Sequence, residues 1–236
     1  MSKVKILRSL LPAYCLVAAG LLLAAYYGSS AVTAIAEQKM VYDRKTVIID
    51  AGHGGIDGGA TSYTGVLESQ INLEIALKLN DLMHLLGIKT RLVRDTDRSV
   101  HTTGNTIAQK KVSDLRERVH IVNSTKDGLL VSIHQNRFPD SRYSGAQVFY
   151  APTGGSKALA SLLQSSFVKN LNPTSKRQIK RADGIYLMQH INCTGVLIEC
   201  GFLSNPQEEY MLRSAGYQQK ICCVIACAIS TQLFGT

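Results

Sequence analysis

The chain has 236 residues, of which 45% are hydrophobic and 18% are charged, and it carries a formal net charge of +9. This length fits one mid-sized domain with an N-terminal appendage, and the composition excludes a disordered or low-complexity chain. A basic domain favours an anionic polymer or a membrane surface as its binding partner. The export signal described next argues against nucleic acid as the partner.

The N-terminus has a basic start followed by an apolar run. Three basic residues lie among the first eight, and no charged residue follows until Glu37, which is the pattern of an export signal. The run is long enough to cross ~30 Å of hydrocarbon as a helix, which predicts a retained anchor, whereas Ala34-Ile35-Ala36 resembles a signal-peptidase site. We expect residues 1–36 to be a signal sequence or membrane anchor, residues 37–44 a linker, and residues 45–236 a catalytic domain on the outer face of the membrane.

The six cysteines do not form the spacing of a disulfide framework. Cys222, Cys223 and Cys227 share one apolar, helix-like run, where small buried thiols are the expected interpretation. The sequence therefore predicts an exported domain without disulfide bonds.

From Lys45 onward, short apolar runs alternate with longer amphipathic ones. Thr46–Asp50 is a run of apolar and β-branched residues, typical of a strand buried on both faces. After a glycine-rich loop, apolar residues recur at helical spacing from about Ser69, and Gly87 ends this helix. Ile88–Arg94 is predicted to be the second strand.

The same patterns assign the rest of the chain. The predicted elements are a long loop at 97–113, a helix at 114–122, strands at 128–134 and 145–150, a helix around 158–167, a basic loop at 176–181, strands at 185–188 and 196–199, and a helix at 221–233. This alternation predicts an α/β fold, a single domain with a mostly parallel central sheet flanked by helices.

Three predicted strands end in side chains suited to metal or proton chemistry. The first runs into His53, the strand at 128–134 ends in His134, and the strand at 196–199 ends in Glu199. Because ligand sites in parallel sheets form where the carboxyl ends of strands meet, these residues are expected to converge. Glu68 lies just before the first helix, after a glycine-rich loop, and can reach the same edge.

Two imidazoles and a carboxylate, with a fourth position open to water, are the ligand set of catalytic zinc hydrolases. Zinc lowers the pKa of bound water to ~7 and polarises a carbonyl group, and a second carboxylate off the metal serves as general base and acid. The sequence pattern alone does not decide whether these residues bind zinc. A histidine after a strand is more often a loop residue, and ligands this far apart form a weaker signal than a compact His-Glu-x-x-His motif.

Around these positions the sequence resembles, in the right order, the signatures of the zinc-dependent N-acetylmuramoyl-L-alanine amidases (the amidase-3 family). The similar segments are 50–60, 65–68, 92–97, 115–123, 132–136 and 199–205, so the resemblance covers nearly everything from Thr46 to the C-terminus. It implies one zinc ion held by His53, Glu68 and His134, with Glu199 as the catalytic acid and base. The implied reaction is hydrolysis of the amide bond between N-acetylmuramic acid and L-alanine in peptidoglycan.

Further segments, at 104–111, 144–147 and 181–189, resemble the spore-cortex members of this family. That resemblance implies action in the forespore intermembrane space or cortex, as the first step towards the muramic-δ-lactam that germination needs. No inhibitory segment or wall-binding module is evident in the sequence, so we expect an accessory or activating protein.

Other residues are candidates for substrate binding. Lys176, Arg177, Lys180 and Arg181 form a basic cluster that either binds carboxylates of the stem peptide or is a solvated loop. Asn136 is expected to orient the substrate or the residues around the metal. Two alternative functions stay open at this point, a zinc exopeptidase with a similar α/β plan and a non-catalytic wall-binding protein.

Overall fold

The structure is a computed structural model that describes residues 23, 26–27 and 45–234. Apart from those three N-terminal residues, the predicted signal sequence or anchor and the linker lie outside the described residues. Residues 44–236 form one compact unit. No helix of the described residues is both long and apolar enough to cross a membrane.

Within residues 45–234 the strands form a six-stranded sheet in the order β2-β1-β3-β6-β4-β5. Strands β2, β1, β3 and β6 are parallel neighbours, whereas β4 runs antiparallel to β6 and β5 is parallel to β4. The predicted α/β fold with a mostly parallel sheet is confirmed. The strands are β1 (Thr46–Ala51), β2 (Thr90–Leu92), β3 (Gly128–Asn136), β4 (Gln147–Tyr150), β5 (Lys180–Arg181) and β6 (Thr194–Phe202).

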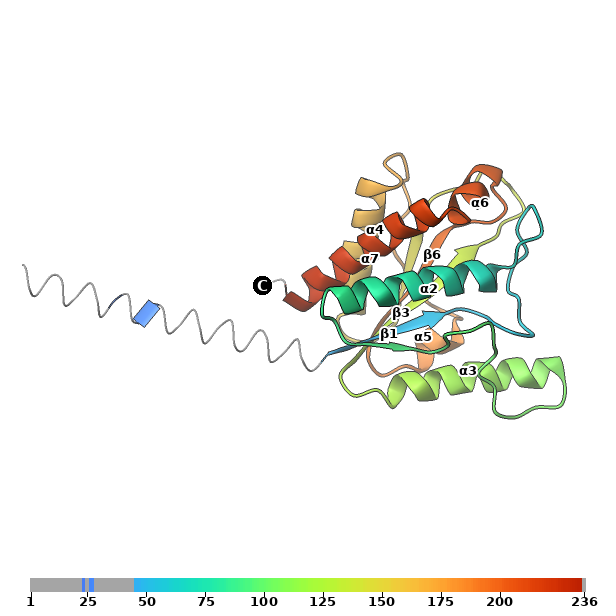
Figure 1. Cartoon of the computed structure of the whole chain (residues 1–236), viewed down its shortest axis with the longest axis horizontal. Coiled ribbons are helices and arrows are strands. Elements are labelled where there is room, and N and C mark those ends of the chain that lie inside the picture. Colours follow the sequence, from blue (N-terminus) through green and yellow to red (C-terminus); the bar gives the residue numbers. More distant parts are fainter. Residues whose placement is uncertain (1–22, 24–25, 28–44, 235–236) are drawn as a thin grey trace, which may run out of the picture. The chain divides into compact units, whose positions relative to one another are not determined.

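Helices cover both faces of this sheet, with α2, α4 and α7 on one side and α3 and α5 on the other (Figure 1). Because both faces are covered, the central strands are mostly apolar, and every residue of β1 is buried. The helices of the described residues are α2 (Glu68–Leu85), α3 (Ile107–Asn123), α4 (Ser156–Asn170), α5 (Tyr186–His190), α6 (Pro206–Leu212) and α7 (Ala215–Phe234).

The hydrophobic core beneath α3 and α5 shows which face of the sheet carries the candidate site residues. Ile48, Leu130 and Leu197 belong to one buried cluster on this face. Side chains alternate between the two faces of a strand, so His134 on β3 and Glu199 on β6 point to the same face as these core residues. The candidate site therefore lies on the α3 and α5 side of the sheet.

The strand predicted at 185–188 is wrong, because this segment opens helix α5 with Ile185 as its N-cap. Four residues are too few for periodicity to separate a strand from a helical turn. The predicted basic loop at 176–181 is correct only in its first part, because Lys180 and Arg181 form β5. The strand predicted at 88–94 is also shorter, at Thr90–Leu92.

The predicted helix start at Asp114 is wrong as well. Helix α3 begins at Ile107, inside the predicted loop, because Thr106 and Gln109 form a capping box in which each side chain accepts a hydrogen bond from the other residue's backbone. Similarly, α7 begins at Ala215 rather than at Ile221, and the sequence patterns gave no prediction of α6.

The five cysteines among the described residues are free, in agreement with a domain without disulfide bonds. The prediction of three buried thiols near the C-terminus is only partly correct. Cys222 is buried against α2, where its thiol lies 3.5 Å from the Ile75 carbonyl oxygen, while Cys223 and Cys227 are exposed. Positions four apart share one stripe of a helix, and this stripe faces away from the core.

Candidate metal centre and active site

Two buried arginines hold the loop that follows β1 and carries His53. Arg94 donates hydrogen bonds to the carbonyl oxygens of Ala51 (2.8 Å) and Gly52 (3.0 Å), and Arg118 donates to those of Ala51 (3.0 Å) and His53 (2.6 Å). His53 has a φ of 62°, in the left-handed region that costs free energy for residues other than glycine. The arginine pair (Arg94 and Arg118) thus stabilises a strained turn that brings the imidazole to the sheet edge.

The charge of Arg118 is compensated beneath this loop. Its guanidinium contacts Asp50, which also accepts a hydrogen bond from the Ser132 hydroxyl (2.6 Å), and it donates to Asp114 (2.6 Å). Burial would raise the pKa of Asp50, but Arg118 and Ser132 outweigh burial and lower it. The loop therefore rests on a buried network of paired charges.

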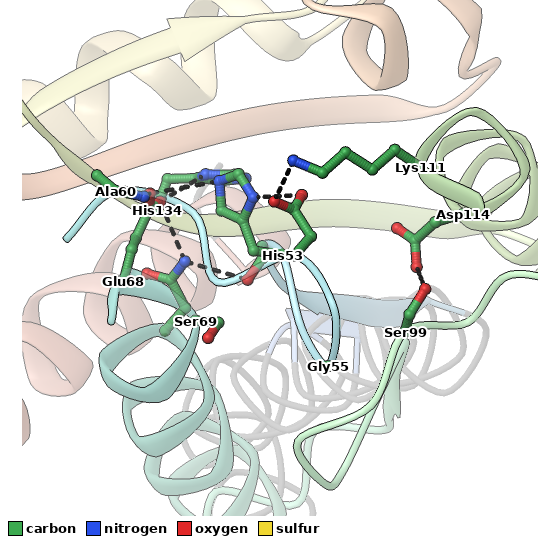
Figure 2. A network of polar contacts seen from close by, with 12 residues as sticks. His53, Gly55, Ala60, Glu68, Ser69, Ser99, Lys111, Asp114 and His134 are labelled. Atoms are coloured by element: carbon green, nitrogen blue, oxygen red, sulfur yellow. Dashed lines mark hydrogen bonds and ion pairs between the residues drawn. The ribbon is translucent and has the colours of Figure 1, made fainter. Parts of the chain in front are cut away.

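His53, Glu68 and His134 form a compact group. Each offers one ligand atom, and these atoms lie within 4.8 Å of one another. The Glu68 carboxylate lies between the two rings, with Oε1 at 3.0 Å from His134 Nδ1 and Oε2 at 3.3 Å from His53 Nε2. Figure 2 shows the three side chains pointing toward one another. The structure thus brings the three predicted metal ligands together.

Glu68 is the first residue of α2 and is 3% exposed. Besides the two histidines, its oxygens accept hydrogen bonds from the backbone amides of Ala60 (2.9 Å) and Gln135 (3.1 Å). Burial would raise the pKa of Glu68, but the hydrogen bonds from His134 and His53 outweigh burial and hold it below its ordinary range. A helix N-terminus also favours a negative charge, so this carboxylate stays ionised.

His53 is oriented from its other ring nitrogen. Nδ1 lies 2.8 Å from Asp57 Oδ2, and the ammonium group of Lys111 lies 2.8 Å from Asp57 Oδ1; in Figure 2 Lys111 reaches from α3 toward this loop. Burial lowers the pKa of His53, but Glu68 and Asp57 outweigh burial and raise it to about 9. The contact to Asp57 leaves Nε2 as the nitrogen that faces Glu68.

Glycines give these side chains their space. A Cβ atom at Gly52 would lie 2.2 Å from His134 Nε2, and one at Gly59 would lie 2.6 Å from Glu68 Oε2. Gly59 also has a φ of +69°, which side chains other than that of glycine rarely adopt. The glycine-rich loop is therefore required by the close approach of the three ligand candidates.

Glu199 lies beside the group without touching it. It pairs with His134 in the parallel register of β3 and β6, and its Oε2 atom is buried without a hydrogen-bond partner among the described residues. Burial raises the pKa of this carboxyl group to about 7. A carboxyl group poised near neutral pH can both accept and return a proton.

The donor set fits a zinc ion. Two imidazole nitrogens and one carboxylate oxygen converge, and the partnerless Glu199 oxygen marks room for a further polar group beside them. A cavity of about 300 Å³ opens onto this group. Its walls include Leu115 from α3 and Tyr186 from α5, which are 39% and 37% exposed, so a substrate strand can reach the site between these helices.

The other predicted residues are placed differently. Asn136 follows His134 by two residues on β3 and pairs with Phe202 after a shift in the register of β3 and β6. Arg177 contacts Gln147 and lies over the Phe202 ring, whereas Lys176, Lys180 and Arg181 are exposed. The predicted basic cluster therefore does not converge as one group.

Some residues around the site were missed by sequence reasoning. Asp57 and Lys111 orient His53, and no role was predicted for Arg94, Arg118 or Gln147. Asp57 had a usable signal, since it follows His53 by four residues in the same glycine-rich loop. No signal in the sequence indicated Lys111, because its contact with Asp57 depends on the packing of α3 against that loop.

Comparison with known proteins gives concordant matches. The family model of N-acetylmuramoyl-L-alanine amidases (Amidase_3) matches residues 47–231. A germination-specific N-acetylmuramoyl-L-alanine amidase of Bacillus subtilis is 38% identical over 179 residues, 75% of each chain. The structure of the CwlD amidase from Clostridioides difficile in complex with the GerS lipoprotein is 40% identical, with a TM-score of 0.77 over 80% of this chain and 98% of that one. An N-acetylmuramoyl-L-alanine amidase from Clostridium difficile 630 is 31% identical, with a TM-score of 0.71 over 81% and 98%.

These matches cover the whole sheet and the loops at its carboxyl edge. The family model spans β1 to α7 and thus includes His53, Glu68, His134 and Glu199. The chain therefore belongs to the N-acetylmuramoyl-L-alanine amidase family, and its substrate is peptidoglycan.

Proposed function

We propose that the chain hydrolyses the amide bond between N-acetylmuramic acid and L-alanine with one zinc ion held by His53, Glu68 and His134. The observation that supports this most is the grouping of the three ligand atoms within 4.8 Å, next to a buried Glu199 oxygen that has no partner among the described residues. Zinc, when bound, supplies Lewis acidity for the scissile carbonyl group and for the attacking water.

The chain's own residues handle the proton and the orientation. Glu199, with its pKa of about 7, takes the proton from the attacking water and returns it to the nitrogen of L-alanine as the amide bond breaks. Asp57 orients His53, and Glu68, which also accepts from the backbone amide of Gln135, orients His134. Asn136, two residues after His134 at the end of β3, is proposed to orient the substrate.

Replacing Glu199 tests this assignment. Glu199→Gln keeps the size of the side chain but removes the proton acceptor, so kcat on peptidoglycan is expected to fall about 10²–10⁴-fold while the zinc content stays at wild type. Glu117→Gln, on the surface of α3, is the matched control and should keep both. Near-normal turnover of Glu199→Gln rules out the assignment.

Mass spectrometry of the digested wall separates the alternatives. The proposed amidase releases peptides with a free L-alanine amino terminus and leaves muramic acid without peptide. A zinc exopeptidase shortens the stem peptide and leaves L-alanine attached, and a wall-binding protein releases nothing. Either of these last two results contradicts the proposal.

The biological setting is also proposed rather than observed. The relatives include a germination-specific amidase, and this supports action in the spore cortex, as the first step towards muramic-δ-lactam. Residues 1–36 are proposed to export the domain and to anchor it on the outer face of the membrane, in the forespore intermembrane space. Spores that lack the gene should then have cortex without muramic-δ-lactam, and cortex with normal lactam content contradicts this setting.

An accessory protein is proposed as well, since the CwlD amidase of Clostridioides difficile was solved in complex with the GerS lipoprotein. Two of the three ligand candidates, His53 and His134, are partly exposed, which supports a need for assistance in zinc retention. Purified full-length chain is expected to lose zinc on dialysis and to keep it when its partner is present. Full zinc occupancy and full turnover of the chain alone exclude a required partner.

A further inference from the structure

A row of side chains crosses the sheet from the metal centre to its far edge. His134 on β3 pairs with Glu199 on β6, and Glu199 pairs with Gln147 on β4. Residues directly opposite each other on neighbouring strands point to the same face. Gln147 Oε1 accepts a hydrogen bond from Arg177 Nη1 (2.9 Å), so the row ends in a guanidinium group on the face that carries the catalytic carboxylate.

This guanidinium group is fixed in place. Arg177 Nε donates to the Ser144 carbonyl oxygen (2.8 Å), and the group lies 4.4 Å from the centre of the Phe202 ring and 5.8 Å from that of Tyr143. These contacts are within the range of cation–π interactions. Nη2 has no hydrogen-bond partner in the described part of the chain, so its N–H groups remain available to a ligand.

Arg177 also lacks a counter-charge. Two arginines in neighbouring loops have one, since Arg142 pairs with Asp140 (2.7 Å) and Arg181 with Asp183 (3.3 Å). Arg177 has no carboxylate within ion-pair distance in the described residues, and the buried Glu208 nearby accepts instead from the backbone amides of Gly145 and Phe202. A fixed guanidinium without an ion-pair partner can bind a ligand carboxylate through charge-assisted hydrogen bonds.

We propose that Arg177 binds the carboxylate that the stem peptide carries on its second residue, an inference that rests on the proposed amidase function. Neighbouring strands are about 4.8 Å apart, and the guanidinium group lies over β6 and β4, so it is roughly 5–10 Å from Glu199. An extended peptide advances about 3.5 Å per residue, which places the second residue after the scissile amide at this distance. In peptidoglycan that residue is a D-glutamate linked through its side chain, and its α-carboxyl group is either free or amidated.

The remaining basic residues of the predicted cluster do not share this position. Lys180 pairs with Phe149 and Arg181 with Tyr150, two and three residues along β4 from Gln147, or roughly 7–10 Å from the row. Lys176 is exposed. Within the predicted cluster, discrimination between a free and an amidated stem peptide is therefore assigned to Arg177.

Two peptides that differ only at this group test the inference. The dissociation constants of L-alanyl-D-glutamate and L-alanyl-D-isoglutamine are measured by calorimetry on the zinc-loaded full chain. Wild type should bind the carboxylate form about 10–100-fold more tightly, the range of charge-assisted hydrogen bonds. Arg177→Gln should abolish the preference by weakening the carboxylate form only, Arg177→Lys should keep part of it, and Lys157→Gln, an exposed cation on α4, should keep all of it.

The same comparison on wall fragments with free or amidated α-carboxyl groups gives kcat/KM. A merely structural role of Arg177 would weaken both forms equally, and this outcome overturns the inference. Equal binding of both peptides by wild type overturns it too, as does loss of the preference in Lys180→Gln. The binding experiment does not depend on turnover. A wild type that discriminates between the peptides but releases no L-alanyl peptide supports the role of Arg177 and contradicts the proposed function.

Discussion

Two glutamates at one edge of the sheet have opposite protonation tendencies. Glu68 contacts two imidazoles and accepts hydrogen bonds from two backbone amides and the Asn72 side chain, and its pKa is lowered. Glu199 has a buried oxygen without a partner among the described residues, and burial raises its pKa to about 7. Pairs of titratable groups whose surroundings separate their pKa values divide acid–base roles between them. This contrast is consistent with Glu68 as a ligand and Glu199 as the proton carrier.

At the residue scale, zinc binding is predicted to release a proton from His53. Without metal, its pKa of about 9 keeps the imidazole protonated at pH 7.5, whereas a metal ligand must be neutral. Calorimetry in two buffers of different ionisation enthalpy should show about one proton released per zinc at this pH. The number should decline towards zero as the pH rises above about 9, because the imidazole is then already neutral.

Asp57→Asn provides the check on that prediction. Loss of this carboxylate lowers the pKa of His53, so fewer protons should be released at pH 8, while Asp183→Asn on the surface should leave the number unchanged. No proton release by wild type at pH 7.5, or identical release by Asp57→Asn, contradicts the assignment of the titrating group.

At the scale of elements, the loop after β1 is positioned by residues from two other parts of the chain. Arg94 follows β2 and Arg118 lies on α3, and both donate to backbone carbonyl oxygens of the loop. Contacts to the backbone fix the path of the chain rather than one side chain. The His53 conformation is thus maintained by the packing of β2 and α3 against β1, as expected for strain at a functional site.

Arg118→Lys is predicted to destabilise the fold and to weaken zinc binding together. An ammonium group cannot reproduce the planar donor fork that contacts Asp50, Asp114 and the loop carbonyl groups. Because lysine keeps the positive charge, the loss of stability should stay below the cost of about 3–5 kcal/mol for removing one partner of a buried ion pair. Urea unfolding of the metal-free chain measures the first effect, and chelator competition measures the second. Arg116→Lys, exposed on the same helix, should change stability by less than about 0.5 kcal/mol. Wild-type zinc affinity in Arg118→Lys would show that the arginine pair does not position the site.

The sequence predicted what depends on local pattern and strand order. The buried runs that end in His53, His134 and Glu199 were recognisable because a parallel sheet covered on both faces needs continuous apolar strands. The segment at 185–188 was misassigned because a single helical turn has no readable period. The contact of Lys111 with Asp57, and of Arg177 with Gln147, depends on how loops pack across the sheet edge, and no sequence spacing encodes that.

At the scale of the whole molecule, the candidate metal group joins three elements that are distant in sequence. His53 follows β1, Glu68 begins α2 and His134 lies on β3, and these elements form the centre of the fold. Every residue of β1 pairs with β3, so the backbone contacts that form the centre of the sheet do not involve the candidate ligands. The three candidate ligand side chains at the edge of the sheet, in contrast, are held in place largely by ion pairs and hydrogen bonds with charged groups.

Zinc is therefore predicted to stabilise a fold that already exists rather than to create it. A ligand at 100 times its dissociation constant adds about 2.7 kcal/mol to the free energy of unfolding, which for a domain of this size raises Tm by roughly 5–10 °C. Thermal unfolding followed by circular dichroism, with zinc and with a chelator, measures this shift. The chelated chain should still unfold cooperatively. His134→Ala should lose the shift, while His120→Ala, an exposed histidine on α3, should keep it. A shift that persists in His134→Ala places the metal elsewhere, and a chelated chain without a cooperative transition shows that the sheet itself depends on the ion.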